Sequence, residues 1–183
     1  MNSQSYLRLT VRYSFILSLL FLGGCLRGNM RPIASFNDAL FRFSSSYREP
    51  SLSNQWLVAL TNSQGKDKIE MINIRTRARI ALPGINRADS QPISVSVSAN
   101  GQRLALVRQR ADQTELLIYR RSVGTLQLIE LIPKGVPRRV SLDSSGRVLA
   151  VQVSRDGKWD LDLIRLWLKR DHLQRLPFTA PAA

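Results

Sequence analysis

The chain holds few side chains that could carry out covalent or metal chemistry. Its only histidine is His172 and its only cysteine is Cys25, within 183 residues. Serine hydrolases of the α/β type place the nucleophile in a Gly-x-Ser-x-Gly elbow, and the sequence has no such pattern. A structural zinc site needs four ligands, mostly nitrogen and sulfur, which one histidine and one cysteine do not supply. We therefore expect no catalytic residue, no bound metal and no enzymatic activity.

Three aspartates come closest to a cation-binding pattern. Asp160 and Asp162 alternate along a predicted strand and so share one face, while Asp156 begins a predicted turn. The spacing does not reproduce an EF-hand loop, which also needs a glutamate at its twelfth position. Glycine-rich phosphate-binding loops are absent as well. We expect Asp156 to form a turn, Asp160 and Asp162 to pair with arginine, and no cofactor to bind.

Arginine is the abundant charged residue, with 22 arginines against 5 lysines and a formal net charge of +14. Guanidinium groups bind carboxylates and phosphates through two parallel hydrogen bonds, so a basic surface favours anionic partners. The alternative is that these arginines are solvated side chains on the outside of strands. We predict that the densest clusters form a patch for an anionic partner: Arg108, Arg110, Arg120, Arg121, Arg138 and Arg139.

Residues 1–24 have the pattern of a signal peptide. Arg8 and Arg12 form a positive start, and residues 13–22 are a short apolar stretch. A helix needs about 20 apolar residues to cross a membrane, so this stretch is too short. It leads into Leu22-Gly23-Gly24-Cys25, which resembles a bacterial lipobox. The resemblance implies that Cys25 carries the lipid, palmitate included, and becomes the first residue of the mature chain.

The same resemblance implies a location. Cys25 is the only cysteine, so it forms no internal disulfide, and lipidation explains its presence in an exported protein. Leu26 follows it where inner-membrane lipoproteins of the enterobacterial type carry aspartate. We therefore expect a lipid-anchored protein of the cell envelope that faces the periplasm, at the outer membrane rather than the inner. An ordinary signal peptide with an incidental cysteine is the alternative.

The mature part, residues 25–183, has the size of one globular domain. The whole chain is 44% hydrophobic, with a mean hydropathy of −0.13. Residues 25–46 are predicted to hold a tether and then a short helix or turn. Its apolar residues recur with helical spacing at Phe36, Ala39, Leu40 and Phe43.

Three similar stretches follow one another along the rest of the chain. Their apolar runs can be aligned on Ala59, Ala105 and Ala150, which are 46 and 45 residues apart. A period near 45 with strand-type segments is typical of propeller blades. Turn residues such as Asn100-Gly101 divide each stretch into four strands. The stretches end at three prolines: Pro83, Pro133 and Pro177.

Two of these stretches resemble a known repeat. Residues 98–106 and 143–151 resemble the Ser-x-Asp-Gly-x-x-Leu-Ala-Phe pattern of TolB-type, WD-repeat-like β-propellers, and residues 154–163 resemble the next turn and strand. The family also has a proline that opens each repeat, for which the sequence offers Pro50, Pro92 and Pro137. The resemblance implies an all-β fold of three four-stranded antiparallel blades. The predicted domain covers residues 47–177, with repeats 47–83, 92–133 and 137–177, and residues 178–183 form a tail.

Three blades raise the question of how the stack is completed, because propellers generally close with four to eight. An open stack exposes an apolar blade face at each end, and large exposed apolar patches usually mark interfaces. Either two chains pair, for example as a six-bladed ring, or a partner covers the ends. The alternative is a monomer whose own N-terminal segment and tail cover them.

These observations predict a non-enzymatic, membrane-anchored envelope lipoprotein that acts as a β-propeller scaffold for protein interaction. Its predicted partners are the membrane, through the lipid, an envelope protein and a second copy of the chain; nucleic acid is not expected. The alternative function is binding of anionic envelope polymers, such as cell-wall glycan or lipid headgroups, through the arginine-rich surface. Membership of the Tol–Pal system rests on the resemblance alone, because fold does not determine function.

Overall fold

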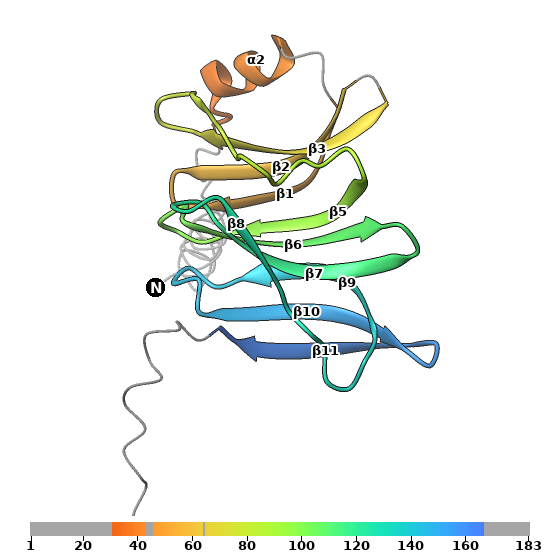
Figure 1. Ribbon diagram of the computed structural model, residues 1–183. Coiled ribbons are helices and arrows are strands. Elements are labelled where there is room, and N and C mark those ends of the chain that lie inside the picture. Colours follow the sequence, from red (N-terminus) through yellow and green to blue (C-terminus); the bar gives the residue numbers. More distant parts are fainter. Residues whose placement is uncertain (1–30, 43–45, 64, 167–183) are drawn as a thin grey trace, which may run out of the picture. The chain divides into compact units, whose positions relative to one another are not determined.

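The computed structural model describes residues 31–42, 46–63 and 65–166 (Figure 1). The predicted short helix is present as α2 (Ala34–Arg42). A boundary between two compact units falls between Asn37 and Asp38, within this helix. Within the described residues, α2 is followed by eleven strands: β1 (Ser46–Ser53), β2 (Trp56–Ser63), β3 (Lys66–Asn73), β4 (Arg79–Ile80), β5 (Ser90–Val97), β6 (Arg103–Arg110), β7 (Gln113–Arg120), β8 (Thr125–Leu128), β9 (Val136–Leu142), β10 (Val148–Arg155) and β11 (Lys158–Arg165).

The strands form three antiparallel sheets in chain order. Blade 1 is β1–β4 and blade 2 is β5–β8, each with its strands side by side in sequence order. Blade 3 is β9–β11, so the described part of the third repeat has three strands. The predicted fourth strand, which would end at Leu176, lies outside the described residues. The all-β prediction of successive propeller-type blades is confirmed.

The turns between strands use the residues that the sequence pattern indicated. Asp156 and Gly157 join β10 to β11, and both have positive φ, 47° and 76°. Two such residues in a row suit the tight hairpin turn that matches the twist of the strands. Ala111 lies in the corresponding turn of blade 2 with φ 50°. Each blade is therefore a run of hairpins, and its strands alternate between its two faces.

Apolar residues from facing blades form two separate cores. Between blades 1 and 2, alternate residues of β2 and β3 pack against alternate residues of β5–β7, centred on Val58, Leu60, Met71, Leu104, Leu106 and Tyr119. Between blades 2 and 3, the other face of blade 2 packs against β9 and β10, centred on Ala105, Val107, Leu116, Leu149, Val151 and Val153. Blade 2 is thus buried on both faces, which explains its nearly continuous apolar strands.

The strand registers correct the alignment of the first repeat by one residue. Ala105 pairs with Ser96 and Ala150 pairs with Ser141, but the matching Ser51 pairs with Val58. Ala59 therefore lies on the opposite face of its blade, since neighbouring strand residues alternate. The cause is the first hairpin, where Ser53 pairs directly with Trp56 around a two-residue turn.

The predicted repeat-opening prolines are equivalent in only two blades. Pro92 pairs with Arg108 and Pro137 pairs with Val153, each beside a bulge in the first strand of its blade. Pro50 instead lies inside the bulge of β1, between the paired residues Arg48 and Ser51. The prediction that Pro50 opens its repeat in the same way is therefore wrong.

The first strands of blades 2 and 3 each lie across the preceding blade, and a serine hydroxyl joins the two blades at each joint. The Oγ of Ser51 accepts a 3.3 Å hydrogen bond from the amide of Val97. The Oγ of Ser96 accepts a 2.9 Å hydrogen bond from the amide of Leu142. Each serine and its donor are 46 residues apart, so one contact is repeated at both joints between blades.

Candidate protein-interaction surface

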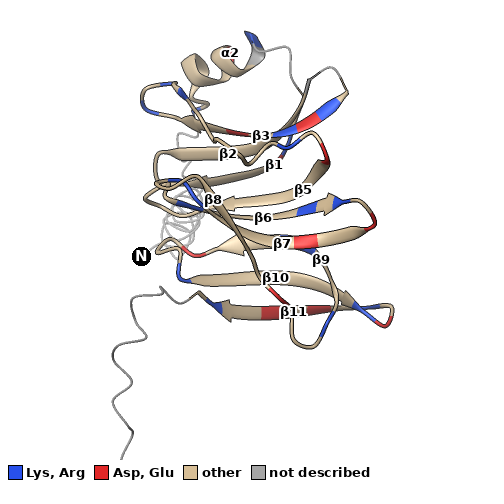
Figure 2. Cartoon of the chain, viewed as in Figure 1, with Lys and Arg blue, Asp and Glu red and all other residues tan. Residues whose placement is uncertain are grey.

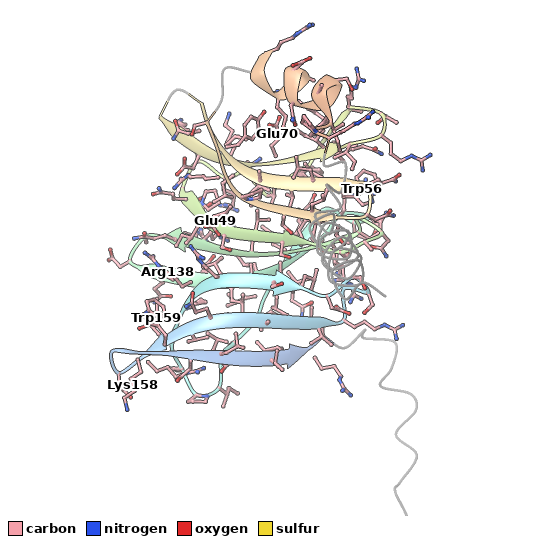
Figure 3. The ribbon with its side chains drawn as sticks, turned by 180° about the vertical axis from the view of Figure 1, so that it is seen from behind. Glu49, Trp56, Glu70, Arg138, Lys158 and Trp159 are labelled. Carbon is pink, nitrogen blue, oxygen red and sulfur yellow. The ribbon has the colours of Figure 1, made fainter. Side chains whose placement is uncertain are left out.

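The outward face of blade 3 exposes a row of apolar side chains on one strand. Trp159, Leu161 and Leu163 alternate along β11 with 59%, 69% and 73% of their surface exposed. Figure 3 shows Lys158 and Trp159 beside the turn that joins β10 to β11. Burying one such side chain stabilises a protein by about 2 kcal/mol. An exposed row of three on a rigid strand therefore marks a surface suited to contact with another sheet.

The equivalent residues of blade 2 are buried by the next blade, which indicates that this face of a blade binds another blade. Leu161 corresponds to Leu116 and Leu163 to Ile118, and those two residues are only 2% and 6% exposed beneath blade 3. Ala150, which pairs with Leu163, corresponds to the fully buried Ala105. The outward face of blade 3 is therefore a blade-binding face with no blade on it in the described structure. We refer to the face made by Ala150, Trp159, Leu161 and Leu163 as the free face.

Beside the free face stands a serine, Ser141, at the position of the two serines that join the other blades. Ser141 stands 45 residues after Ser96, which stands 45 residues after Ser51. The Ser51 and Ser96 hydroxyls each accept an amide of the next blade, whereas no hydrogen bond to the Ser141 hydroxyl occurs among the described residues. Ser141 also lines a groove of about 410 Å³ that runs from Leu161 to the first strands of blades 1 and 2.

The opposite end of the blade series exposes a matching edge. Leu52 of β1 occupies the position of Val97 and Leu142, which are buried against the preceding blade. Leu52 itself is 62% exposed, and Pro50, in the bulge two residues before it, is exposed as well. We refer to Pro50 and Leu52 as the leading edge of blade 1.

The arginines predicted to form one anionic patch lie in three separate places. Arg108 and Arg110 stand at one end of β6, while Arg120 stands at the far end of β7, opposite Arg103. Seven residues of strand separate the two ends, about 23 Å. Arg138 and Arg139 lie on β9 in another blade. The basic segments in Figure 2 are accordingly spread over both ends of the strands.

Arg108 and Arg110 are engaged within the protein. The Nε of Arg108 donates a 2.7 Å hydrogen bond to Glu115 Oε2, and the residue is only 6% exposed. Its Nη1 is buried and has no hydrogen-bond partner among the described residues. Arg110 donates to Asp89 at 3.0 Å, next to Arg87. The hydrogen bond from Arg87 and the nearby charge of Arg110 lower the pKa of Asp89 to about 2.

The other four arginines are more exposed but differ in their contacts. Arg121 donates to the carbonyl of Gly101 at 2.7 Å and lies 5.2 Å from the centre of the Trp56 ring. Arg139 lies 3.6 Å from Glu49 of blade 1. Arg120 and Arg138 are exposed and have no hydrogen bond or ion pair in the described structure. A role for these arginines in binding anions stays a prediction.

The aspartates of blade 3 pair with arginine, as the sequence predicted. Arg155 lies within 2.6 Å of Asp162 and 3.5 Å of Asp160. It also donates to the carbonyl of Pro133, in the segment that leads into its blade. The hydrogen bond from Arg155 lowers the pKa of Asp162. Residues 31–42, 46–63 and 65–166 hold no group of three or more histidine, cysteine, aspartate or glutamate side chains able to bind a metal.

Two residues considered in the sequence, a cysteine and a histidine, are not described by the structure. Cys25 and His172 lie outside the described residues. Within the part that is described, no helix is both long and apolar enough to span a membrane. The roles of Ser51 and Ser96 were not predicted from the sequence, although the spacing of 45 residues between Ser51, Ser96 and Ser141 could have indicated them.

Comparison with solved structures identifies the fold. No family model and no curated protein sequence matches the chain. TolB from Acinetobacter baumannii is similar over 64% of this chain and 29% of its own, with 16% identity and a TM-score of 0.50. The β-propeller domain of the trilobed protease from Pyrococcus furiosus is similar over 66% of this chain and 39% of its own, with 14% identity and a TM-score of 0.49.

A puromycin-hydrolysing peptidase of Mycobacterium tuberculosis is also similar, over 66% of this chain and 19% of its own, with 16% identity and a TM-score of 0.49. The chain thus spans well under half of each of these three proteins. Identities this low bear on the fold alone. The similarity to TolB, together with the three antiparallel sheets, shows that this chain has the TolB-like β-propeller fold.

Proposed function

We propose that this chain is a non-enzymatic lipoprotein of the cell envelope, anchored through Cys25, whose blades serve as a scaffold for protein interaction. The observation that carries the proposal is the free face of blade 3, an exposed apolar sheet surface on a rigid blade. The lipobox-like segment before Cys25 supports the anchor and, with Leu26, an outer-membrane location facing the periplasm.

The chemistry of the free face favours a protein as its partner. It is apolar, with a tryptophan beside two leucines, and buried aromatic side chains contribute much of the binding energy of protein interfaces. An anionic glycan or lipid headgroup would instead be favoured by clustered, unpaired cations. The predicted arginines are dispersed, and Arg108 and Arg110 are already paired with acids.

The non-enzymatic part of the proposal rests on the poor supply of reactive side chains. One histidine and one cysteine exist in the whole sequence. A protease and a peptidase are among the proteins of similar structure, but the likeness concerns the propeller fold alone. We infer that the blades of this chain bind rather than catalyse.

Lipidation is tested by growing cells that express the chain with a radioactive or clickable palmitate analogue. The natural chain should take up the label and sediment with the membranes. The variant Cys25→Ser should do neither, because the hydroxyl does not replace the thiol in this modification. Equal labelling of both chains would remove the anchor from the proposal.

Protein binding is tested by placing a photo-crosslinking amino acid at Leu163 in living cells. Leu128 of β8 is a matched control, because it is also an exposed leucine on a strand but lies away from the free face. We expect a discrete protein adduct from position 163 and none from position 128. Absence of any protein adduct at position 163 would contradict the scaffold function.

A further inference from the structure

The two joints between blades indicate what kind of surface would bind the free face. At both joints the docking element is a first strand, lying across the preceding blade. It brings two alternate apolar residues, Val95 and Val97 in blade 2 or Val140 and Leu142 in blade 3. It also brings one amide to a serine hydroxyl. Any occupant of the free face should therefore present an apolar first strand with an amide directed at Ser141.

The chain itself carries such a strand at its other end, where Leu52 is exposed although Ala59 and Ile72, on the same face of blade 1, are buried. Leu52 corresponds to Val97, and Pro50, inside the bulge of β1, precedes it by two residues; both are exposed. Leu52 pairs with Leu57 in the register in which Val97 pairs with Leu104. Its amide therefore points away from β2, as the amide of Val97 points away from β6 toward Ser51. The leading edge thus offers an exposed apolar side chain and an outward-pointing amide, the two features expected of a strand that binds the free face.

We propose that the free face of blade 3 binds the leading edge of blade 1 of a second copy, with the Ser141 hydroxyl accepting the amide of that copy's Leu52. This inference rests on the proposed function, because it names the protein that the free face binds. The contact joins two different surfaces, so it is heterologous and must either close into a ring or grow into a filament. Two copies supply six blades, within the four to eight that close a propeller. The predicted assembly is therefore a closed dimer.

Charge substitutions on the two surfaces test this pairing. The full chain, purified in a non-ionic detergent, is measured by sedimentation and light scattering over a range of protein concentrations. We expect a dimer whose dissociation constant rises at least tenfold in Leu161→Asp and, independently, in Leu52→Asp. Leu128→Asp, an exposed leucine on neither surface, should leave the dimer unchanged. Circular dichroism confirms that each variant is folded.

Each other outcome has a defined meaning. A folded natural chain that is monomeric at all concentrations would overturn the pairing. A dimer that Leu161→Asp weakens and Leu52→Asp does not would show two free faces in contact, and would overturn the head-to-tail arrangement. A monomer together with a photo-adduct of a different protein at position 163 would overturn the pairing but keep the scaffold function. A monomer with no adduct would overturn both.

Discussion

The hydroxyl oxygen of Ser96 accepts a 2.9 Å hydrogen bond from the backbone amide of Leu142, and so ties the first strand of blade 3 to that of blade 2. The preceding joint repeats this contact between Ser51 and Val97. First strands of a sheet have one unpaired edge, and a buried amide without an acceptor is costly. The serine supplies the acceptor and fixes how neighbouring blades meet.

Removing this acceptor should weaken the joint. Ser96→Ala leaves the buried amide of Leu142 without a partner, which costs about 1–3 kcal/mol of unfolding free energy. Ser141→Ala removes an equivalent hydroxyl that makes no hydrogen bond within the described residues. Its effect should stay within about 0.5 kcal/mol. Urea unfolding at low protein concentration measures both. Equal losses in the two variants would contradict the joining role of Ser96.

The turn glycine of blade 2 should tolerate no side chain. Gly101 has φ 66°, and a Cβ placed on it would lie 2.7 Å from the Trp56 ring. Gly65 also has positive φ, 76°, but a Cβ there would meet no atom within 4 Å. We expect Gly65→Ala to cost about 1 kcal/mol through backbone strain alone, and Gly101→Ala to cost clearly more. Thermal unfolding compares the two, and equal costs would show that Trp56 yields freely.

Arg108 should act as a structural residue rather than a surface cation. Replacing it with alanine leaves Glu115, whose side chain is 21% exposed, without its ion-pair partner. Loss of one partner of a largely buried pair is strongly destabilising, here by about 2 kcal/mol because Glu115 keeps some water contact. Arg120→Ala, at an exposed position, should change the unfolding free energy by less than about 0.5 kcal/mol. The same small change in both variants would contradict the burial of Arg108.

Acid should destabilise the fold through its paired carboxylates. Hydrogen bonds lower the pKa of Asp67, chiefly that from Asn62, and lower the pKa of Asp89 to about 2. The pKa of an aspartate in an unfolded chain is about 3.9. Their stabilising effect is therefore complete above that pH and is lost as the pH falls towards 2.

Denaturant midpoints measured between pH 5 and pH 2.5 test this expectation. The natural chain should lose stability across that range. The double variant Asp67→Asn, Asp89→Asn should be less stable at pH 5 and should lose less on acidification. A natural chain with the same midpoint at pH 5 and pH 2.5 would contradict the ion pairs described around these residues.

The strands and turns of the fold could be predicted from local sequence, but the register of the first repeat could not. Apolar alternation and pairs such as Asp156-Gly157 depend on neighbouring residues alone. Whether Val58 or Ala59 matches Ala105 depends on a hairpin two residues shorter than its equivalents, and a slip of one residue reverses the faces. Only the pairing of Ser51 with Val58 decides between them.

The candidate site, too, could be predicted from the sequence only in part. Exposure of an end face follows from counting blades, so the free face could be expected before its residues were known. Alternation along a strand puts Arg108 and Arg110 on one face of β6. It could not show that this face packs against blade 1, or that Glu115 on the next strand would pair with Arg108. Contacts between strands and between blades decide what becomes surface.

The most direct measurement is a disulfide formed between two copies at the proposed joint. In a chain with Cys25→Ser, one preparation carries Ser141→Cys and a second, differently tagged, carries Leu52→Cys. The double variant Ser51→Cys, Val97→Cys is the control, because these residues occupy the equivalent joint within one chain. We predict a covalent dimer when the two preparations are mixed under mild oxidation, and little from either alone. Rapid formation of the control disulfide with no covalent dimer in the mixture would contradict the central claim that the free face binds the leading edge of a second copy.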